Sequence, residues 1–403
     1  MRFIVAQLGA RMHYAVPAIL ARADMLERLY TDTYAAARLR SLFGGPSHRM
    51  PAPLRRWLGR IPLDIPEERI VSFAGLGLEY YWRRVRSAAS GSSSGAYLWG
   101  GGELCRRVLR RGLGNGEGVY TFNSAGLELL EAARTRGLAA VMEQTIAPGA
   151  VEDELLDFER RSFPEWEPAG VRDPFRGALN ERERREWAAS DLILCGSEFV
   201  REGIEACGGP VDRCRVVPYG IRLPTELPAK DFSHRPLRIL TVGMVGLRKG
   251  APYVLEAARR LKGAAQFRMV GHLAIPRHVQ ELLGAHLDLV DAVPRAEMRR
   301  HFLWADVFLL PSICEGSATA TYEALGYGLP TIATANAGSV VRHGIDGFVV
   351  PIRDSDAIVE KLQCLDADRD LLATMSRSAR QRAEDFTLER YGERLLSELY
   401  AFH

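Results

Sequence analysis

The sequence predicts an α/β protein built from two doubly wound, Rossmann-like domains. The chain has 403 residues, which is too long for one ordinary hydrophobic core. Short apolar segments alternate with helical ones, most cleanly after residue 237, and such alternation requires parallel crossovers. A proline-bearing connection from Val217 to Pro236 separates the two units and is the expected domain linker.

The composition is that of a soluble globular protein, with 47% hydrophobic and 26% charged residues. No apolar run approaches the roughly 18 residues of a membrane-spanning helix. Six scattered cysteines form no metal or disulfide pattern, so we expect a reducing, cytoplasmic location. Residues 1–120 carry 18 arginines against 9 acidic residues, which makes the first lobe basic.

The first unit contains four apolar segments that we expect to be buried strands: Phe3–Leu8, Gly118–Phe122, Leu138–Met142 and Leu192–Cys195. Helices are expected at Ser124–Arg136 and Asn180–Ala189. Two stretches break this pattern. Ala35–Pro62 holds six arginines and no acidic residue, whereas Ser87–Gly102 is rich in serine and glycine and is predicted to be a mobile loop.

The second unit alternates regularly. We expect strands at Leu237–Gly243, Phe267–Gly271, Leu287–Val290, Val307–Leu310, Pro330–Ala333 and Gly347–Val350. Ligands bind beyond the carboxyl ends of parallel strands, so the loops of interest are Met244–Gly250, His272–Pro276, Asp291–Pro294 and Pro311–Ala318. A last helix is expected over Leu388–Tyr400.

Two adjacent cations, Arg248 and Lys249, lie between a strand and a helix in a loop that contains Gly246 and Gly250. This pattern offers charge and donors to a diphosphate. The loop is not a P-loop, because its spacing differs and no Ser or Thr follows the lysine. Two solvated surface charges remain the alternative interpretation.

Two glutamates, Glu315 and Glu323, flank the start of a predicted helix and would lie about 12 Å apart along it. The amides of Gly316, Ser317 and Ala318, followed by Thr319, come at the helix N-terminus, which favours anions. Carboxylates on either side of an anion site suit the ribose and sugar hydroxyls that flank a pyrophosphate. The alternative is a helix cap at Glu315 and an exposed face residue at Glu323.

Together with Gly328-Leu329-Pro330 and Gly344–Val350, these motifs resemble the retaining glycosyltransferases of family 4, which have the GT-B fold of two domains facing each other across a cleft. The resemblance is specific over residues 237–385. It implies an acceptor-binding domain over 1–220, a nucleotide-sugar domain over 221–385, and a helix over 386–403 that crosses back to the first domain.

The resemblance also implies roles for individual residues. Arg248 and Lys249 would bind the donor pyrophosphate, Glu323 the ribose, and Glu315 with the Gly316 and Ser317 amides the transferred sugar. Arg248, Lys249 and Glu315 are thus the expected catalytic residues. Further contacts to the nucleotide or the phosphates are expected from Gly9, Gly246, Gly271, Val293 and Pro294.

The acceptor side departs from the family pattern. The segment Val141–Thr145 has no histidine where the family often has one, so Glu143 is the candidate acceptor contact there. His13, just after the first strand, is a second candidate acceptor contact, with a structural histidine as the alternative. The linker has Tyr219 in place of the usual asparagine. Asp354-Ser355-Asp356 and Asp366-Ala367-Asp368 match an Asp-x-Asp metal pattern, but they precede helices and are predicted to be caps. No metal or other cofactor is expected.

The resemblance therefore implies transfer of a hexose, with retention, from a UDP- or GDP-sugar to a sugar, lipid-linked or small-molecule acceptor. Alternatives are a GT-B epimerase that acts on a nucleotide sugar alone and a nucleotide-sugar-binding protein without turnover. Nucleic acid is not an expected partner. The basic, apolar stretch 35–62 suits either a peripheral contact with the inner face of a membrane or a solvated insertion.

Overall fold

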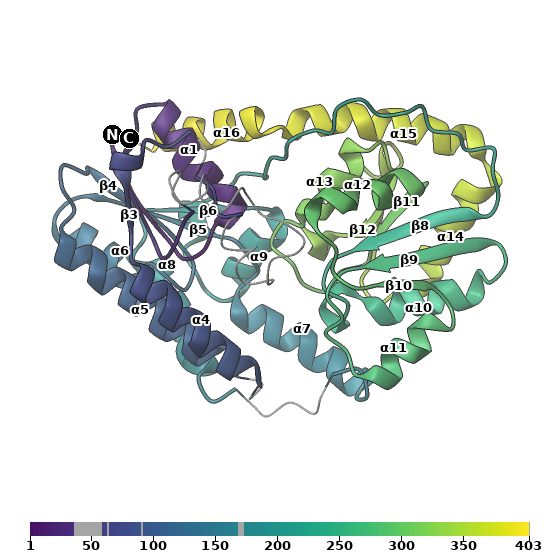
Figure 1. The fold of residues 1–403 in the computed structure, drawn as a ribbon, viewed down its shortest axis with the longest axis horizontal. Coiled ribbons are helices and arrows are strands. Elements are labelled where there is room, and N and C mark those ends of the chain that lie inside the picture. Colours follow the sequence, from purple (N-terminus) through teal and green to yellow (C-terminus); the bar gives the residue numbers. More distant parts are fainter. Residues whose placement is uncertain (36–58, 63, 90–91, 168–172, 403) are drawn as a thin grey trace.

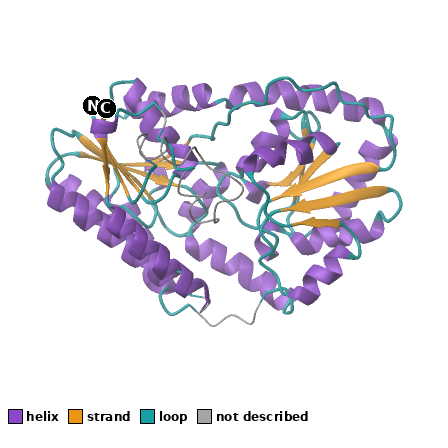
Figure 2. Ribbon diagram, viewed as in Figure 1, coloured by secondary structure: helices purple, strands orange, loops and turns teal. Residues whose placement is uncertain are grey.

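The computed structural model describes residues 1–35, 59–62, 64–89, 92–167 and 173–402. It contains two parallel sheets, one in each of two α/β domains, so the predicted fold class is confirmed (Figure 1). Helices cover both faces of each sheet (Figure 2). Most of the predicted stretch 35–62 lies outside the described residues.

Within the described residues, the first sheet has seven parallel strands in the order β3-β2-β1-β4-β5-β6-β7. They span Phe3–Gln7 (β1), Leu26–Thr31 (β2), Ile70–Ser72 (β3), Gly118–Phe122 (β4), Ala139–Gln144 (β5), Leu192–Cys195 (β6) and Cys214–Val216 (β7). The four central strands were predicted because they are buried on both faces and therefore apolar throughout. Sequence reasoning missed β2, where Glu27 and Arg28 interrupt the apolar pattern, and the short outer strands β3 and β7.

The described helices of the first domain are α1 (Ala15–Arg22), α4 (Ala74–Ala89), α5 (Ser94–Arg111), α6 (Leu127–Thr135), α7 (Gly149–Ser162), α8 (Arg176–Ala189) and α9 (Glu198–Ala206). The expected mobile loop at 87–102 is wrong, since most of it forms the end of α4 and the start of α5. The glycines of α5 lie where the helix packs closely against its neighbours. A Cβ atom on Gly101 would lie 2.1 Å from the carbonyl oxygen of Ser124, so only glycine fits there.

The second sheet has six parallel strands in the order β10-β9-β8-β11-β12-β13. They span Leu237–Val242 (β8), Ala265–Val270 (β9), Asp288–Val290 (β10), Val307–Leu310 (β11), Thr331–Thr334 (β12) and Gly347–Val350 (β13). Its helices are α10 (Ala251–Arg260), α11 (Arg277–Gly284), α12 (Arg295–Trp304), α13 (Thr319–Gly326), α14 (Ser355–Ala367) and α15 (Arg369–Ala383). Asp354 and Asp368 accept hydrogen bonds from Ala357 and Leu371 at the starts of α14 and α15, so their prediction as caps is confirmed.

Two helices tie the domains together. α16 (Leu388–Ala401) follows α15 along the top of Figure 1 and packs on α1, with Leu395 and Leu399 buried in the core of the first domain. α7 reaches the other way, because its Leu156 belongs to the core of the second domain. In the same region Glu159 is fully buried and pairs with Arg353, 2.6 Å away.

The loops that follow β5 and β11 meet between the two domains, since the Ala147 amide donates to the Glu315 carbonyl oxygen at 3.3 Å. In the described parts of the chain, every helix is too short or too polar to span a bilayer.

Candidate active site

Arg248 joins the two loops that follow the central strands of the second domain. It lies in a single 3-10 turn (η4, Leu247–Lys249) after β8, and its carbonyl oxygen accepts the Ile313 amide at 2.9 Å. Its guanidinium donates to the Cys314 carbonyl oxygen at 3.0 Å and to Glu315 Oε2 at 3.2 Å. The cation is therefore held at the strand-end loop that carries Glu315.

Lys249 approaches the same carboxylate from its other side. Its Nζ lies 2.8 Å from Glu315 Oε1, but away from a hydrogen-bonding direction, and this buried oxygen has no hydrogen-bond donor among the described residues. Gly243 lets the lysine pass, since a Cβ atom there would lie 2.8 Å from Lys249 Cε. Two cations thus converge on one buried carboxylate, and cations held together in this way can also bind a phosphate group.

Gly316 is the point at which this loop touches the first domain. Its carbonyl oxygen accepts a hydrogen bond from Ser197 Oγ at 2.5 Å, and a Cβ atom at this position would lie 2.0 Å from the carbonyl oxygen of Thr145. The neighbouring Glu315 carbonyl oxygen accepts the Ala147 amide at 3.3 Å. The loop is therefore wedged against the segment that follows β5, and only glycine fits there.

The amides at the start of α13 divide into two kinds. The Ala318 amide donates to the Ala337 carbonyl oxygen at 3.0 Å. It is therefore already engaged, although the sequence predicted that it would face an anion. Among the described residues no acceptor is paired with the Gly316 and Ser317 amides. Two of the three expected amide donors are therefore available to a ligand.

Glu323 lies on α13 and faces a cavity between the two domains. Its Oε1 is 2.5 Å from Arg295 Nη2, at the start of α12. Both side chains line a cavity of about 690 Å³ that we name the Glu323 cavity, together with Met12 and His13 of the first domain and Thr319. Burial and the nearby Arg295 and Arg222 lower the pKa of His13, which favours its neutral form.

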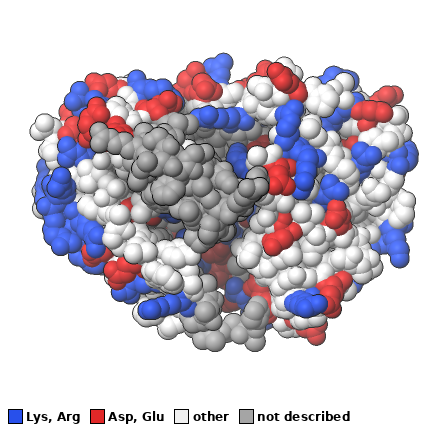
Figure 3. All heavy atoms as spheres, viewed as in Figure 1, with Lys and Arg blue, Asp and Glu red and all other residues white. Residues whose placement is uncertain are grey.

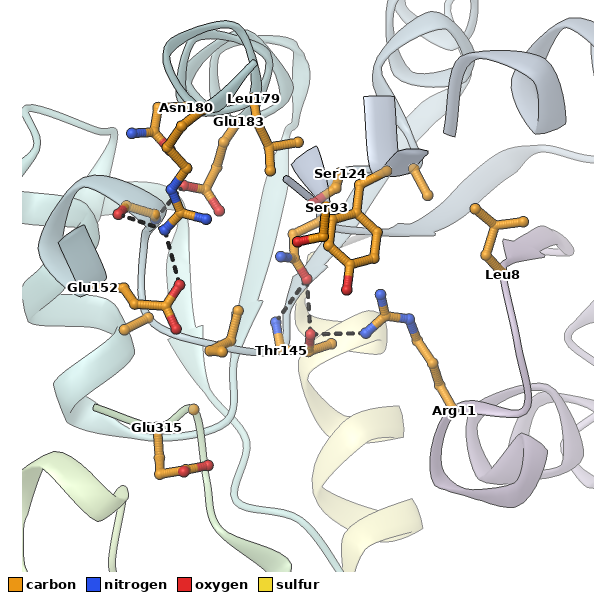
Figure 4. A pocket seen from close by; sticks show the side chains of 18 of the residues that line it. Leu8, Arg11, Ser93, Ser124, Thr145, Glu152, Leu179, Asn180, Glu183 and Glu315 are labelled. Atoms are coloured by element: carbon orange, nitrogen blue, oxygen red, sulfur yellow. Dashed lines mark hydrogen bonds and ion pairs between the residues drawn. The ribbon is translucent and has the colours of Figure 1, made fainter. Parts of the chain in front are cut away.

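Glu315 faces a different cavity, of about 530 Å³, which we name the Glu315 cavity. Arg248, Gly316 and Ser317 line it from the second domain, and most of its wall comes from the first. In Figure 4, Glu152 and Glu315 lie on one side of Thr145 and Arg11 on the other. The start of α13 therefore lies between two cavities, with one predicted carboxylate in each.

The wall formed by the first domain carries an ordered polar network. Arg11 donates to Thr145 Oγ1 at 2.9 Å, and Thr145 Oγ1 lies 2.8 Å from Asn123 Oδ1 (Figure 4). Glu152 of α7 is 2.8 Å from Arg176 and 3.6 Å from Arg248, so it bridges the two domains. Hydroxyl, amide and charged groups thus line the side of the cavity that faces Glu315.

Sequence reasoning missed all five of these polar side chains. Arg11, Asn123 and Thr145 follow the carboxyl ends of β1, β4 and β5, so the rule that places ligands there could have drawn attention to them. Glu152 and Arg176 lie on helices, and no local pattern distinguishes them from surface charges.

The remaining predicted donor residues lie at strand ends. The Gly9 amide donates to Asp32 Oδ1 at 2.9 Å and is therefore already engaged. Gly271 lies against the loop after β8, because a Cβ atom there would meet the Gly243 carbonyl oxygen at 1.9 Å. Gly246 has an extended backbone just before η4.

Val293 and Pro294 lie where β10 leads into α12. Val293 packs partly buried against an apolar cluster of the second domain, and Pro294 immediately precedes the first residue of the helix. Both residues therefore lie next to Arg295, whose side chain lines the Glu323 cavity.

The loop after β1 is strained. Met12, His13 and Tyr14 have φ angles of 43°, 53° and 64°, a left-handed conformation that residues other than glycine rarely adopt. Each such residue costs about 1–2 kcal/mol. Met12 and His13 line the Glu323 cavity and the preceding Arg11 lines the Glu315 cavity. The strain thus occurs between the two cavities.

Glu143, the other candidate acceptor contact, lies away from the Glu315 and Glu323 cavities. It is buried, and its two oxygens accept hydrogen bonds from Tyr120 at 2.6 Å and Tyr219 at 3.1 Å. Burial raises the pKa of this carboxyl group. Tyr219, the tyrosine that replaces asparagine in the linker, therefore holds Glu143 inside the protein. The contacts of Glu143 are those of a buried structural residue.

Cys314 does not add a nucleophile to this site. Cys314 is buried beside Glu315, and burial raises the pKa of its thiol to about 12, which disfavours a nucleophile. Within the described ranges, no three His, Cys, Asp or Glu side chains come together as a group that could hold a metal ion.

The two facing Rossmann-like domains define the GT-B class, and solved structures bear out this fold. Anabaena HepE, solved in complex with UDP, superimposes with a TM-score of 0.64 at 13% identity, over 100% of both chains. A sucrose-phosphate synthase from Thermosynechococcus elongatus gives 0.65 at 16% identity, again over 100% of both chains. At these identities the likeness establishes the fold alone.

The sequence comparison then identifies the family that the second domain matches. Residues 236–368 match the family model described as Glycosyl transferases group 1, so the predicted resemblance to glycosyltransferases is confirmed. The chain is 28% identical over 245 residues to the amylovoran biosynthesis glycosyltransferase AmsK of Erwinia amylovora, covering 56% of this chain and 60% of AmsK. It is 28% identical over 237 residues to a D-inositol 3-phosphate glycosyltransferase of Geodermatophilus obscurus, covering 52% of each. The matches thus span about three fifths or less of these relatives.

Proposed function

We propose that the protein is a retaining glycosyltransferase that transfers a hexose from a UDP- or GDP-sugar to a hydroxyl-bearing acceptor without a metal ion. One observation carries the proposal. Two carboxylates, Glu315 and Glu323, open into separate cavities on either side of the α13 N-terminus, and two cations converge beside the first. This order of groups matches a molecule with hydroxyls at both ends and a diphosphate between them.

The donor would extend from one cavity to the other. Glu323 would accept hydrogen bonds from the ribose, while Arg248, Lys249 and the Gly316 and Ser317 amides hold the diphosphate. Glu315, released from its two cations, would accept hydrogen bonds from hydroxyls of the transferred sugar. As the bond to the sugar breaks, negative charge grows on the phosphate, and fixed cations and amides stabilise that charge without reorganising.

The acceptor would enter the Glu315 cavity from the first domain. Arg11, Asn123, Thr145 and Glu152 present donors and acceptors that suit a hydroxyl-rich molecule. A matching relative of Escherichia coli is a UDP-Gal:alpha-D-GlcNAc-diphosphoundecaprenol alpha-1,3-galactosyltransferase, 35% identical over 80 residues that cover 19% of this chain and 20% of that protein. The donor and acceptor in the name of that protein support the choice of a UDP-sugar and of a sugar or lipid-linked acceptor.

We place the acceptor on the face of the sugar that the diphosphate leaves, because attack on that face retains the anomeric configuration. The acceptor oxygen bonds to the anomeric carbon as the carbon–phosphate-oxygen bond breaks, and the acceptor proton passes to the leaving phosphate. The carboxylates of the cavity wall support this route, because both are already engaged. Glu152 is paired with Arg176, and Glu183 accepts hydrogen bonds from Gln144 at 2.7 Å and the Gly149 amide at 2.9 Å, so neither is free to act as a nucleophile.

The test is a panel of UDP- and GDP-sugars, each with and without glycan and lipid-linked acceptors, in the presence of EDTA. We expect acceptor-dependent release of nucleoside diphosphate and a product whose anomeric configuration by NMR equals that of the donor. Conversion of the nucleotide sugar alone would instead indicate an epimerase. Thermal stabilisation by nucleoside diphosphates with no turnover across the panel would indicate a binding protein and overturn the proposal.

A further inference from the structure

The helix α4 carries an apolar stripe on the side that faces solvent. Leu78, Tyr81, Trp82 and Val85 are 61%, 43%, 53% and 45% exposed. Their spacing of three, four and seven residues places them on one face of the helix. Since an amphipathic helix normally turns such a face to the core, this exposed stripe indicates a surface that binds something apolar.

A neighbouring hollow continues the stripe toward α5. It has a volume of about 1180 Å³ and is lined by Leu78, Trp82, Leu98, Trp99 and Phe175. Phe175, which comes just before α8, is itself 50% exposed. The apolar surface is therefore a patch spread over α4, α5 and one residue beside α8, which is too wide for a single exposed side chain to explain.

The charges around this patch are mainly positive, although Glu79 and Glu128 also line the hollow. The two helices, Ala74–Arg111, contain seven arginines and two glutamates. Arg84 and Arg86 flank the stripe on opposite sides of α4, and Arg110 and Arg111 end α5. Basic side chains gather over this outer end of α5, at the left margin of Figure 3. The ligand of the patch should therefore be apolar in its interior and anionic at its surface.

We propose that the outer face of the α4–α5 pair seats the protein on an anionic lipid bilayer. The aromatic and aliphatic stripe would enter the headgroup boundary, where tryptophan and tyrosine are favoured, and the arginines would contact lipid phosphates. This face is distinct from residues 36–58, which lie outside the described structure. The proposal stands on the surface alone and does not require the proposed activity.

The same helix pair connects this surface to the Glu315 cavity. Tyr80 of α4 and Tyr97 of α5 line that cavity, while their neighbours Trp82 and Leu98 line the outer hollow. A helix is about 10 Å across, so a bound bilayer would lie roughly that far from the cavity. If the proposed function holds, an acceptor anchored in the bilayer could reach the active site around the edge of this pair.

Flotation with lipid vesicles tests the proposal on the full chain. The vesicles are phosphatidylcholine alone or phosphatidylcholine with about one third phosphatidylglycerol. We expect the protein to float with the anionic vesicles only, and less as salt rises, because screening weakens the arginine contacts. Trp82→Ser should lower the bound fraction at least about fivefold, and Arg86→Glu should act in the same direction.

Ile345→Ser is the matched control, because Ile345 is also exposed (49%) but lies in the second domain. It should float as the wild type does. Unchanged melting temperatures of all three variants would show that they fold. The proposal is overturned if the wild type fails to float with anionic vesicles, or if Trp82→Ser and Ile345→Ser bind equally. Vesicle binding is read without any turnover, so this failure is separate from failure of the proposed function.

Discussion

Lys249 Nζ lies 2.8 Å from Glu315 Oε1, and Arg248 lies beside the other oxygen of the same carboxylate. In the proposed reaction this lysine would move its charge from the carboxylate to the donor phosphate. Lys249→Ala should therefore lower kcat/KM for donor turnover about 100- to 1000-fold, the usual effect of removing one preorganised group that stabilises developing charge. Steady-state assays of nucleoside diphosphate release measure this loss.

Arg277→Ala is the control for that substitution, because Arg277 is 91% exposed on α11 and pairs only locally with Glu281. Its kinetics should match the wild type. Equal donor turnover by the Lys249 and Arg277 variants would contradict the assignment of the phosphate site.

Glu323 and Arg295 form the charged pair of the other cavity. Glu323→Ala removes the proposed acceptor of the ribose hydroxyls, and hydrogen bonds to a charged group contribute about 1.5–3 kcal/mol. The donor KM should rise about 10- to 100-fold, with a smaller change in kcat. Arg295→Ala should leave the donor KM unchanged or lower it, because Arg295 competes for the same carboxylate. A Glu323 variant with the donor KM of the wild type would exclude the ribose role.

Asn123 is predicted to act on the acceptor and not on the donor. Its side chain orients Thr145, which also receives a hydrogen bond from Arg11. Asn123→Ala should raise the acceptor KM up to about 10-fold, the range of one neutral hydrogen bond, and leave donor hydrolysis without acceptor unchanged. Thr135→Ala, on the exposed side of α6, is the control. Equal effects of Asn123→Ala on donor and acceptor kinetics would argue for a structural role.

Tyr219 is predicted to stabilise the linker. Tyr219→Phe leaves Glu143 Oε1 buried without its hydroxyl donor, which should lower the free energy of unfolding by about 1–3 kcal/mol. Urea unfolding measures the change against Tyr400→Phe, whose ring is 60% exposed on α16. If the two variants are equally stable, the buried hydrogen bond contributes nothing measurable.

Glu186 predicts a pH dependence of stability. It is fully buried and accepts hydrogen bonds from the Ser124 amide at 2.7 Å and the Gly126 amide at 3.0 Å at the start of α6. Burial nevertheless raises the pKa of its carboxyl group from 4.5 to about 7. Between these values the folded chain holds a proton that the unfolded chain has lost, so this contribution to stability is complete below pH 4.5 and is lost as the pH rises to 7.

The contribution of Glu186 amounts to roughly 3 kcal/mol over that interval. Glu186→Gln should remove this part of the pH dependence, so the difference in unfolding free energy between wild type and variant should change by that amount. Denaturant titrations from pH 4 to 8 measure it, with Glu131→Gln on an exposed site as the control. Parallel pH profiles of the wild type and Glu186→Gln would contradict the prediction.

Much of the architecture was readable because burial on both faces makes a strand apolar throughout. β1, β4, β6 and β11 were recognised for this reason, and the turn from β11 into α13 identified Glu315 and its neighbours. β2 was missed because Glu27 and Arg28 break its apolar run, and the glycines of α5 suggested a loop because sequence alone cannot show what they pack against.

The sequence by itself determined the parallel α/β order, the caps at Asp354 and Asp368, and the loop that joins Arg248 and Lys249 to the helix after it. These features depend on the period of the backbone and on residues close together in the chain. Only the tertiary structure decided that Glu315 meets both cations, that Thr145 and Asn123 complete its cavity, and that Glu143 turns inward to Tyr219. Those outcomes depend on how two separately wound sheets face each other, and contacts between distant segments leave no periodic trace in the sequence.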